Sequence, residues 1–260
     1  MLGRIGPGIR GALANPRRTA RLLRTRVFAA DIILSDPDAY QVMGSYTYGK
    51  LPRVELSQLF PGVERLDLSI CKPFATESAT SLSASELLAV AAIARMSNAR
   101  RIVEVGTFNG VTTLNLAANS SPDARVSTID LPPDWGGALG LDVPDDMKNV
   151  TPRDRVGFYF RDTPLSGKIH QVFDDSAVLD WSRLDGPFDL AFIDGCHTFD
   201  YVVRDTENAR ANLTPGGILV WHDYGIIEDV SRAVDQCASD LNPSAIRGTR
   251  LAVARTNGTR

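Results

Sequence analysis

Short runs of apolar residues, many of them β-branched, alternate along this chain with longer segments in which apolar residues recur at helical spacing. A short apolar run predicts a strand buried on both faces, whereas recurrence every three or four residues predicts an amphipathic helix. Strands are predicted at 102–105, 125–130, 169–173, 188–193 and 218–221, and helices at 83–96, from 111, at 199–213 and at 227–241. Regular alternation of the two indicates a doubly wound α/β fold around a mostly parallel sheet.

The last two apolar segments, 245–249 and 251–256, are separated by Arg250 alone, which suits an antiparallel hairpin. With this hairpin we expect seven strands in the sheet. Ser83-Ala84-Ser85-Glu86 in front of the helix at 83–96 has the form of a capping box. The regular part of the chain therefore begins near residue 81.

Residues 1–80 are expected to form a basic arm followed by a cap segment. Seven arginines lie in residues 1–26, and residues 16–34 can form an amphipathic helix. This arm either packs on a partner subunit or on the domain's own surface, or it adheres to an anionic membrane surface. We expect the arm to pack on a partner subunit, and hence we expect a homo-oligomer, most simply a dimer. Residues 35–80 are expected to form short helices and irregular structure over the substrate end.

Residues 81–260 then form the main domain, interrupted where the alternation stops at residues 131–168. A polar insertion beside the tips of the first strands is typical of a lid or a substrate-selecting segment.

Composition narrows the possible functions. The 260 residues are 43% hydrophobic and 23% charged, which is ordinary for a globular protein, and the net charge of −3 gives no reason to expect a nucleic acid as partner. Three cysteines without a C-x-x-C pair predict a reduced, cytoplasmic compartment. No apolar run reaches the roughly 18 residues that predict a membrane span, and no signal-peptide pattern is present.

A glycine-rich loop, Gly106-Thr107-Phe108-Asn109-Gly110, joins the first strand of the domain to a helix. Such a loop lets the backbone approach a ligand closely. Its spacing is not the G-x-G-x-x-G of dinucleotide binding, so NAD is disfavoured. Asp130 closes the second strand, where a carboxylate can accept hydrogen bonds from ribose hydroxyls. The loop and Asp130 predict a nucleoside-like cofactor at this end of the sheet.

Three polar residues follow the later strands. Asp194 and Asp223 end two successive strands, and His197 lies three residues after Asp194. If the two strands are adjacent and parallel, their carboxylates meet at one edge, where a cation such as Mg²⁺ would relieve their repulsion. A metal-held hydroxyl could then lose its proton to His197. The alternative is that Asp194 caps the following helix and His197 is a packed surface residue.

Longer motifs resemble a known family. The pattern F-I-D-G-x-H-x-[YF]-x-x-V-x-x-D, then L-x-P-G-G, then H-D-Y, occupies Phe192–Asp205, Leu213–Gly217 and His222–Tyr224. Together with E-x-G-x-x-x-G at Glu104–Gly110, it resembles class I S-adenosylmethionine (SAM) dependent methyltransferases. Within them it is most similar to the bacterial group that includes the macrocin and mycinamicin sugar O-methyltransferases. The resemblance covers roughly residues 80–224 and implies their Rossmann-like fold.

The resemblance also implies a cofactor site. SAM would lie at the tips of the first two strands, with the G-D-S-like element Asp174-Asp175-Ser176 near the adenine. The usual glycine of that element is Asp174 in this chain. The residues implied to contact SAM are Glu104, Gly106, Thr107, Gly110, Asp130, Asp175, Ser176 and Asp194.

For the reaction, the resemblance implies that Asp194 and Asp223 bind Mg²⁺ and that His197 is the base. Relatives often carry a second acid where this chain has His222, which leaves the metal ligands incompletely assigned. The expected function is methyl transfer from SAM to a hydroxyl of a sugar or glycosylated small molecule. Two alternatives stay open: a metal-independent methyltransferase, and a SAM-binding protein without activity. Retention of both acids and the histidine argues against the last.

Overall fold

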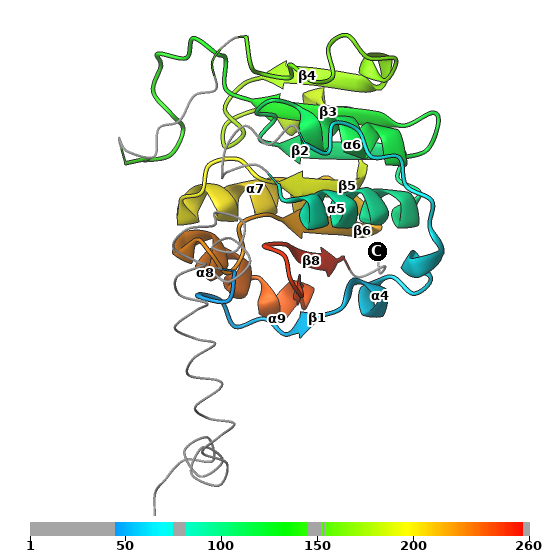
Figure 1. Ribbon diagram of the computed structural model, residues 1–260. Helices are drawn as coiled ribbons and strands as arrows, with labels where there is room; N and C mark the ends of the chain where they lie inside the picture. The colour runs from blue at the N-terminus through cyan, green and yellow to red at the C-terminus, as the bar shows by residue number, and fades with distance from the viewer. Residues whose placement is uncertain (1–44, 75–81, 145–151, 153, 257–260) are drawn as a thin grey trace, which may run out of the picture.

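The computed structural model describes residues 45–74, 82–144, 152 and 154–256 (Figure 1). The predicted basic arm, with its helix at 16–34 and its role in oligomerisation, lies outside the described residues. Among the described residues, no helix is long and apolar enough to cross a membrane.

Within the residues that the structure describes, the centre of the molecule is a mixed sheet of eight strands, one more than expected from the sequence. Their order across the sheet is β1-β7-β8-β6-β5-β2-β3-β4. All pairs are parallel except those of β8, which runs antiparallel to both β6 and β7. The strands are β1 (Arg53–Val54), β2 (Arg101–Val105), β3 (Arg125–Asp130), β4 (Ile169–Phe173), β5 (Phe188–Ile193), β6 (Leu213–Trp221), β7 (Ser244–Ile246) and β8 (Ala252–Arg255).

The additional strand is β1, which lies in the segment expected to be irregular. It has two residues and pairs with β7 at the edge of the sheet. A strand this short carries no readable period, so its pairing depends on β7 rather than on its own sequence.

Helices cover both faces of the sheet, as a doubly wound fold requires. In Figure 1, α5 and α6 lie side by side against one face, and the cluster that they bury includes Ile102, Leu190 and Val220. The neighbouring residues along the same strands point the other way and pack under α7 and α8. The helices are α4 (Leu56–Leu59), α5 (Ala84–Ser97), α6 (Val111–Asn119), α7 (Phe199–Ala211), α8 (Glu228–Gln236) and α9 (Ala238–Leu241).

Several predicted boundaries need correction. The helix expected at 227–241 is two helices, because the chain turns at Cys237 between α8 and α9. The hairpin connection is the five residues between β7 and β8, not Arg250 alone. Strand β6 starts at Leu213, five residues before the apolar run, since backbone pairing with Phe188 of β5 extends the ladder beyond the buried part. The antiparallel hairpin itself is confirmed.

The capping box at the start of α5 is confirmed. Ser83 accepts a hydrogen bond from the Glu86 backbone, and the Glu86 side chain accepts one from the Ser83 backbone. Glu86 is nonetheless buried, with 1% of its surface exposed. A capping residue normally faces solvent, so this glutamate has further partners inside the molecule.

Candidate active site

The two predicted strand-end acids lie side by side. β5 and β6 are parallel neighbours with Ile193 opposite Trp221, so Asp194 and Asp223 leave the sheet at the same edge. His197 lies between them: its Nε2 is 3.5 Å from Asp194 Oδ1 and 3.2 Å from Asp223 Oδ2. The structure thus brings together three residues that the sequence placed by strand order alone.

The local geometry differs from the expectation in one respect. Residues 195–198 form a loop, and α7 begins at Phe199 with Thr198 at its N-cap position. Asp194 therefore does not cap the helix, and the alternative role of this residue as a helix cap is excluded. The loop, rather than a helical turn, carries His197 back over Asp194.

The charges around His197 favour its protonated form. Burial alone lowers the pKa of an imidazole, but the contact with Asp194 and the negative charges of Asp223 and Asp194 outweigh it. The pKa of His197 is therefore raised above its ordinary value of 6.5. Its Nε2 has no hydrogen-bond partner of good geometry among the described residues, although it is buried. This nitrogen is one atom of the cluster that can bind a ligand.

Asp223 is held from both sides. Its Oδ1 accepts a hydrogen bond from Arg250 Nη1 at 2.8 Å, while its Oδ2 faces His197. Its backbone has φ +55°, in the left-handed region that non-glycine residues seldom adopt. Burial would raise the pKa of Asp223, but the charges of His222, His197 and Arg250 hold it well below its ordinary value. Asp223 is therefore ionised at neutral pH.

His222 connects Asp194 to the capping glutamate of α5. Its Nδ1 is 3.0 Å from Asp194 Oδ1, and its Nε2 is 3.4 Å from Glu86 Oε2. Despite full burial, which alone lowers an imidazole pKa, the charges of Asp194 and Asp223 raise the pKa of His222 well above 6.5. His222, which stands where the resemblance implied a second acid, is thus a buried cation between carboxylates.

Glu86 also binds Arg250 through three contacts. The backbone N–H and Nε of Arg250 donate to Oε1 at 2.7 and 2.9 Å, and Nη2 donates to Oε2 at 2.7 Å. Burial would raise the pKa of Glu86, but His222 and Arg250 hold it well below its ordinary value. Paired and hydrogen-bonded in this way, the buried charges satisfy one another.

These contacts revise the electrostatic argument for a metal. Repulsion between Asp194 and Asp223 is already relieved by Arg250 and His222, so repulsion alone does not require Mg²⁺. The donor set still fits a cation: Asp194, His197 and Asp223 each offer a ligand atom, and these atoms lie within 4.8 Å of one another. Two carboxylates and an imidazole are ligands that divalent cations accept.

The glycine-rich loop lies beside this cluster. Gly106 has φ +96°, and a Cβ added there would fall on the Asp194 carbonyl oxygen. Phe108 N–H donates to Asp130 Oδ2 at 2.8 Å, so Asp130 shapes the loop as well as closing β3. Asn109 Nδ2 is buried without a partner among the described residues. A polar ligand at this loop would find an unused donor there.

Glu104 lies beneath the loop and is fully buried. Its Oε2 accepts hydrogen bonds from the hydroxyls of Thr113 and Thr128, and Thr107 Oγ1 lies 2.7 Å from Thr128 Oγ1. Its Oε1 has no partner in the described part of the chain. Burial, offset in part by the two threonines and reinforced by the charges of Asp194 and Asp130, raises the pKa of Glu104 to about 8.

Asp175 binds the backbone of the insertion at 131–168. Its Oδ2 accepts hydrogen bonds from Gly140 N–H at 2.7 Å and from Tyr201 O–H at 2.9 Å. Ser176 offers its carbonyl oxygen to Trp181 Nε1 and to Asn208 Nδ2. Both residues are buried behind these contacts. Their predicted contact with the cofactor stays a prediction.

The far end of the insertion covers the glycine-rich loop. Gly157 N–H donates to Phe108 C=O at 2.8 Å, and Tyr159 N–H donates to Asn109 C=O at 3.0 Å. The Phe160 ring lies over Gly110, where an added Cβ would come within 2.5 Å of it. The insertion is therefore bound to the expected cofactor loop, as a segment beside a site should be.

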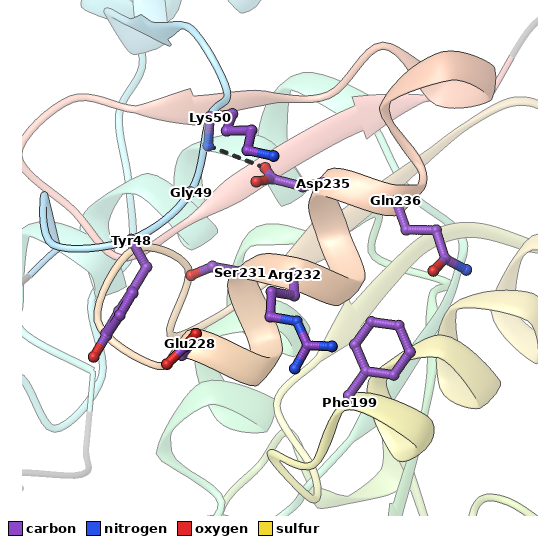
Figure 2. Close-up of a pocket in the computed structure, with 9 residues that line it drawn as sticks. All are labelled: Tyr48, Gly49, Lys50, Phe199, Glu228, Ser231, Arg232, Asp235 and Gln236. Atoms are coloured by element: carbon purple, nitrogen blue, oxygen red, sulfur yellow. Dashed lines mark hydrogen bonds between the residues drawn. The ribbon is translucent and has the colours of Figure 1, made fainter.

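A hollow of about 430 Å³ opens between residues 48–50, the start of α7 and α8 (Figure 2). Phe199 and Glu228, the first residues of α7 and α8, both line it. Arg232 stacks 4.9 Å from the Phe199 ring centre. The lining continues along α8 to Asp235 and Gln236 and includes none of Asp194, His197 and Asp223.

Sequence reasoning missed two members of this site. The local sequence predicts a capping role for Glu86 and a turn position for Arg250. Neither local pattern indicates a contact with the site. A buried partner for Asp223 was foreseeable, since two acids at one dry edge need positive charge. Which arginine supplies it depends on the packing of α5 against the C-terminal hairpin, which no local pattern reports.

The chain is similar to known proteins over part of its length. Residues 103–224 match the family model described as a methyltransferase domain. A protein of Mycobacterium sp. (strain JLS), provisionally named an O-methyltransferase, is 30% identical over 162 residues. The alignment covers 62% of this chain and 64% of that protein, less than two thirds of its length. A protein of Mycobacterium avium (strain 104) with the same name is also 30% identical, over 164 residues.

Solved structures share the fold. The O-methyltransferase TomG from Streptomyces achromogenes, solved with SAM, aligns with a TM-score of 0.51 at 19% identity, over 80% of this chain and 92% of its own. An O-methyltransferase from Bacillus cereus, solved with S-adenosylhomocysteine (SAH), aligns with a TM-score of 0.52 at 16% identity, over 77% and 90%. The chain thus has the Rossmann-like α/β fold of the methyltransferases, and its residues 103–224 match their domain family.

Proposed function

We propose that this protein is a SAM-dependent O-methyltransferase. The observation that carries the proposal is the meeting of Asp194, His197 and Asp223 at one edge of the sheet, directly beside the glycine-rich loop. Binding a cofactor alone needs no such cluster. The domain match and the named activity of the mycobacterial relatives support the same conclusion.

SAM supplies an electrophilic methyl group on a positively charged sulfur. In this chain the glycine-rich loop at Gly106–Gly110 and Asp130 would hold it, with Thr107 in the loop and Glu104 below. The loop fits such a molecule, because Asn109 Nδ2 and Glu104 Oε1 are buried polar atoms without partners among the described residues. Asp175 and Ser176 are proposed to border the adenine, and Asp194 the methyl end.

His197 is proposed as the general base. Asp194 and Asp223 fix its Nε2 toward the centre of the cluster, where it would accept the proton of an acceptor hydroxyl during attack on the methyl group. Much of the rate enhancement would come from holding the hydroxyl in line with the transferred methyl. The two acids then stabilise the imidazolium that forms.

A divalent cation such as Mg²⁺ is proposed at Asp194 and Asp223, where it would lower the pKa of a bound hydroxyl. Its support is the donor set of Asp194, His197 and Asp223, whose ligand atoms lie within 4.8 Å of one another. The competing candidate is a metal-independent enzyme in which His197 acts alone. The pairing of Asp223 with Arg250 favours this second candidate, because it supplies positive charge without a metal.

The proposed acceptor is a hydroxyl of a sugar or glycosylated small molecule. The resemblance to the macrocin and mycinamicin group supports this class. The hollow beside α7 and α8 is lined by residues other than Asp194, His197 and Asp223, so the resemblance is what supports this class.

The test is an acceptor screen with methyl-labelled SAM and the full-length protein. We expect calorimetry to detect SAM but not NAD, and mass spectrometry to find one added methyl on a glycosylated acceptor. His197→Ala should lower kcat by roughly 10²–10⁴, whereas His170→Ala, at a half-exposed histidine away from the cluster, should not. Repeating the assay in chelator separates the two candidates. SAM binding without turnover of any hydroxyl would instead indicate a non-catalytic SAM-binding protein.

The pH profile of the active enzyme has a defined sign. His197 acts as base only when neutral, and its pKa lies above 6.5. The acidic limb of kcat/KM should therefore have its midpoint above pH 6.5, and activity should rise as pH increases through it. An acidic limb centred below pH 6 would contradict the assignment of His197.

A further inference from the structure

Two residues outside the matched methyltransferase domain reach into the candidate active site. The match covers residues 103–224, whereas Glu86 lies on α5 and Arg250 in the connection between β7 and β8. Their side chains are 2% and 4% exposed. Two segments far from Asp223 in the sequence thus place a buried ion pair beside its carboxylate.

The geometry of this pair divides the guanidinium between two carboxylates. Nε and Nη2 of Arg250 bind the two oxygens of Glu86, which is the two-pronged pairing that fixes an arginine most firmly. The remaining Nη1 binds Asp223 Oδ1. Asp223 then has one oxygen on Arg250 and the other on His197, at 2.8 and 3.2 Å.

The backbone reinforces the same arrangement. Arg250 C=O accepts a hydrogen bond from Tyr224 N–H at 2.9 Å, and Arg250 N–H donates to Glu86. The hairpin is therefore bound to the residue after Asp223 as well as to its side chain. Asp223 keeps its left-handed backbone within this frame, and such conformations persist only where the surroundings fix them.

We propose that Glu86 and Arg250 are positioning residues of the active site, which fix the Asp223 carboxylate so that one of its oxygens faces His197. The inference rests on the proposed function only in assigning His197 and Asp223 to catalysis. Glu86 acts through Arg250 and does not touch the reacting atoms. Through His222, the same glutamate also faces Asp194.

Three variants of the full-length protein test this proposal. Arg250→Met removes the charge at similar length, Glu86→Gln keeps the shape and the capping acceptor, and the double variant removes both charges together. Replacing both partners of a buried pair by neutral residues is often tolerated, whereas removing one leaves an unpaired buried charge. The double variant therefore guards against simple loss of folding. Arg247→Met is the matched control, since Arg247 pairs with Glu55 at 2.8 Å on the exposed side of the same hairpin.

Four measurements are made on each variant: thermal unfolding, SAM affinity by calorimetry, a crystal structure, and kcat on the acceptor identified for the wild type. We expect both single variants and the double variant to lose the contact between Asp223 Oδ2 and His197 Nε2 and to lower kcat at least tenfold. SAM affinity should stay within a few-fold. The double variant should regain the melting temperature but not the contact. A fourth variant, Arg250→Lys, should retain activity only in part, because an ammonium cannot bind both carboxylates as the guanidinium does.

The opposite results are equally clear. If the double variant regains stability and keeps Asp223 against His197, the pair has a structural role alone and the proposal is overturned. This conclusion about the pair requires no measurement of turnover. If the wild type methylates no hydroxyl, the proposed function fails, while the crystal structures and melting temperatures still decide whether Glu86 and Arg250 position Asp223.

Discussion

At the scale of single residues, the site is defined by how buried charges are shared. Asp194 and Asp223 are ionised, because His222 and His197 lower the pKa of both against the effect of burial, and Arg250 lowers that of Asp223 further. Glu104 has no such cation, and burial raises its pKa to about 8. Two kinds of carboxyl group therefore lie within one edge of the sheet, ionised ones at the acceptor half and a protonated one under the cofactor loop.

Glu104 gives a prediction for stability against pH. Its folded pKa of about 8 lies above the ordinary value of 4.5, so the native state keeps a proton that the unfolded chain releases. This group should therefore lower the free energy of unfolding by about 1.4 kcal/mol per pH unit as pH rises between those two values. Below the lower value, its contribution is constant.

Glu104→Gln should remove this dependence, since an amide does not titrate. The free energies of unfolding of the variant and the wild type are compared by urea unfolding of the SAM-free protein. The measurements are made at about pH 5.5, 6.5 and 7.5, which lie between the two pKa values. We expect the stability of the variant relative to the wild type to increase with each increase in pH. A constant difference across the three pH values would show that Glu104 is ionised in the folded protein.

At the scale of elements, the two halves of the site are joined by a close approach of backbones. Gly106 follows β2 and lies against the residue that follows β5, and Asp194 N–H donates to Val105 C=O at 2.8 Å. The glycine thus serves two needs: a positive φ and room for the Asp194 carbonyl. The glycine-rich motif consequently positions the candidate catalytic acid as well as lining the expected cofactor site.

Gly106→Ala should therefore destabilise the protein more than the backbone angle alone explains. Gly62 is the matched control, with φ +93° and open space around it. Gly62→Ala should lower the free energy of unfolding by about 1–2 kcal/mol from the left-handed backbone, whereas Gly106→Ala adds a collision with Asp194 and should lower it by roughly 3 kcal/mol or more. Equal effects in urea unfolding would mean that the loop moves aside freely.

At the scale of the whole molecule, elements outside the matched residues 103–224 complete the core and the site. α5 contributes much of one core cluster, and β8 covers the edge of β6 that Asp223 follows. Arg250, which binds Asp223, and Glu86, which binds Arg250 and faces His222, lie outside the matched residues. The site is therefore a property of the entire sheet rather than of its central strands.

A protein trimmed to residues 99–226 should accordingly fail to unfold cooperatively. It would expose the apolar residues beneath α5 and leave β6 as an open edge, which favours aggregation. A protein trimmed to residues 45–256 retains every described element and should give a single cooperative transition by circular dichroism. Cooperative unfolding of the shorter protein would show that the flanking elements contribute little.

The sequence by itself determined the parallel core and the placement of the main polar residues. Apolar runs mark the central strands, and acids at their ends must meet when the strands are parallel neighbours, so Asp194, His197 and Asp223 were predictable together. These signals are local or follow from strand order. The short edge strand β1 and the pairing of Glu86 with Arg250 and His222 are different. Each depends on contacts between segments far apart in the chain, and the tertiary structure alone decides which residues meet there.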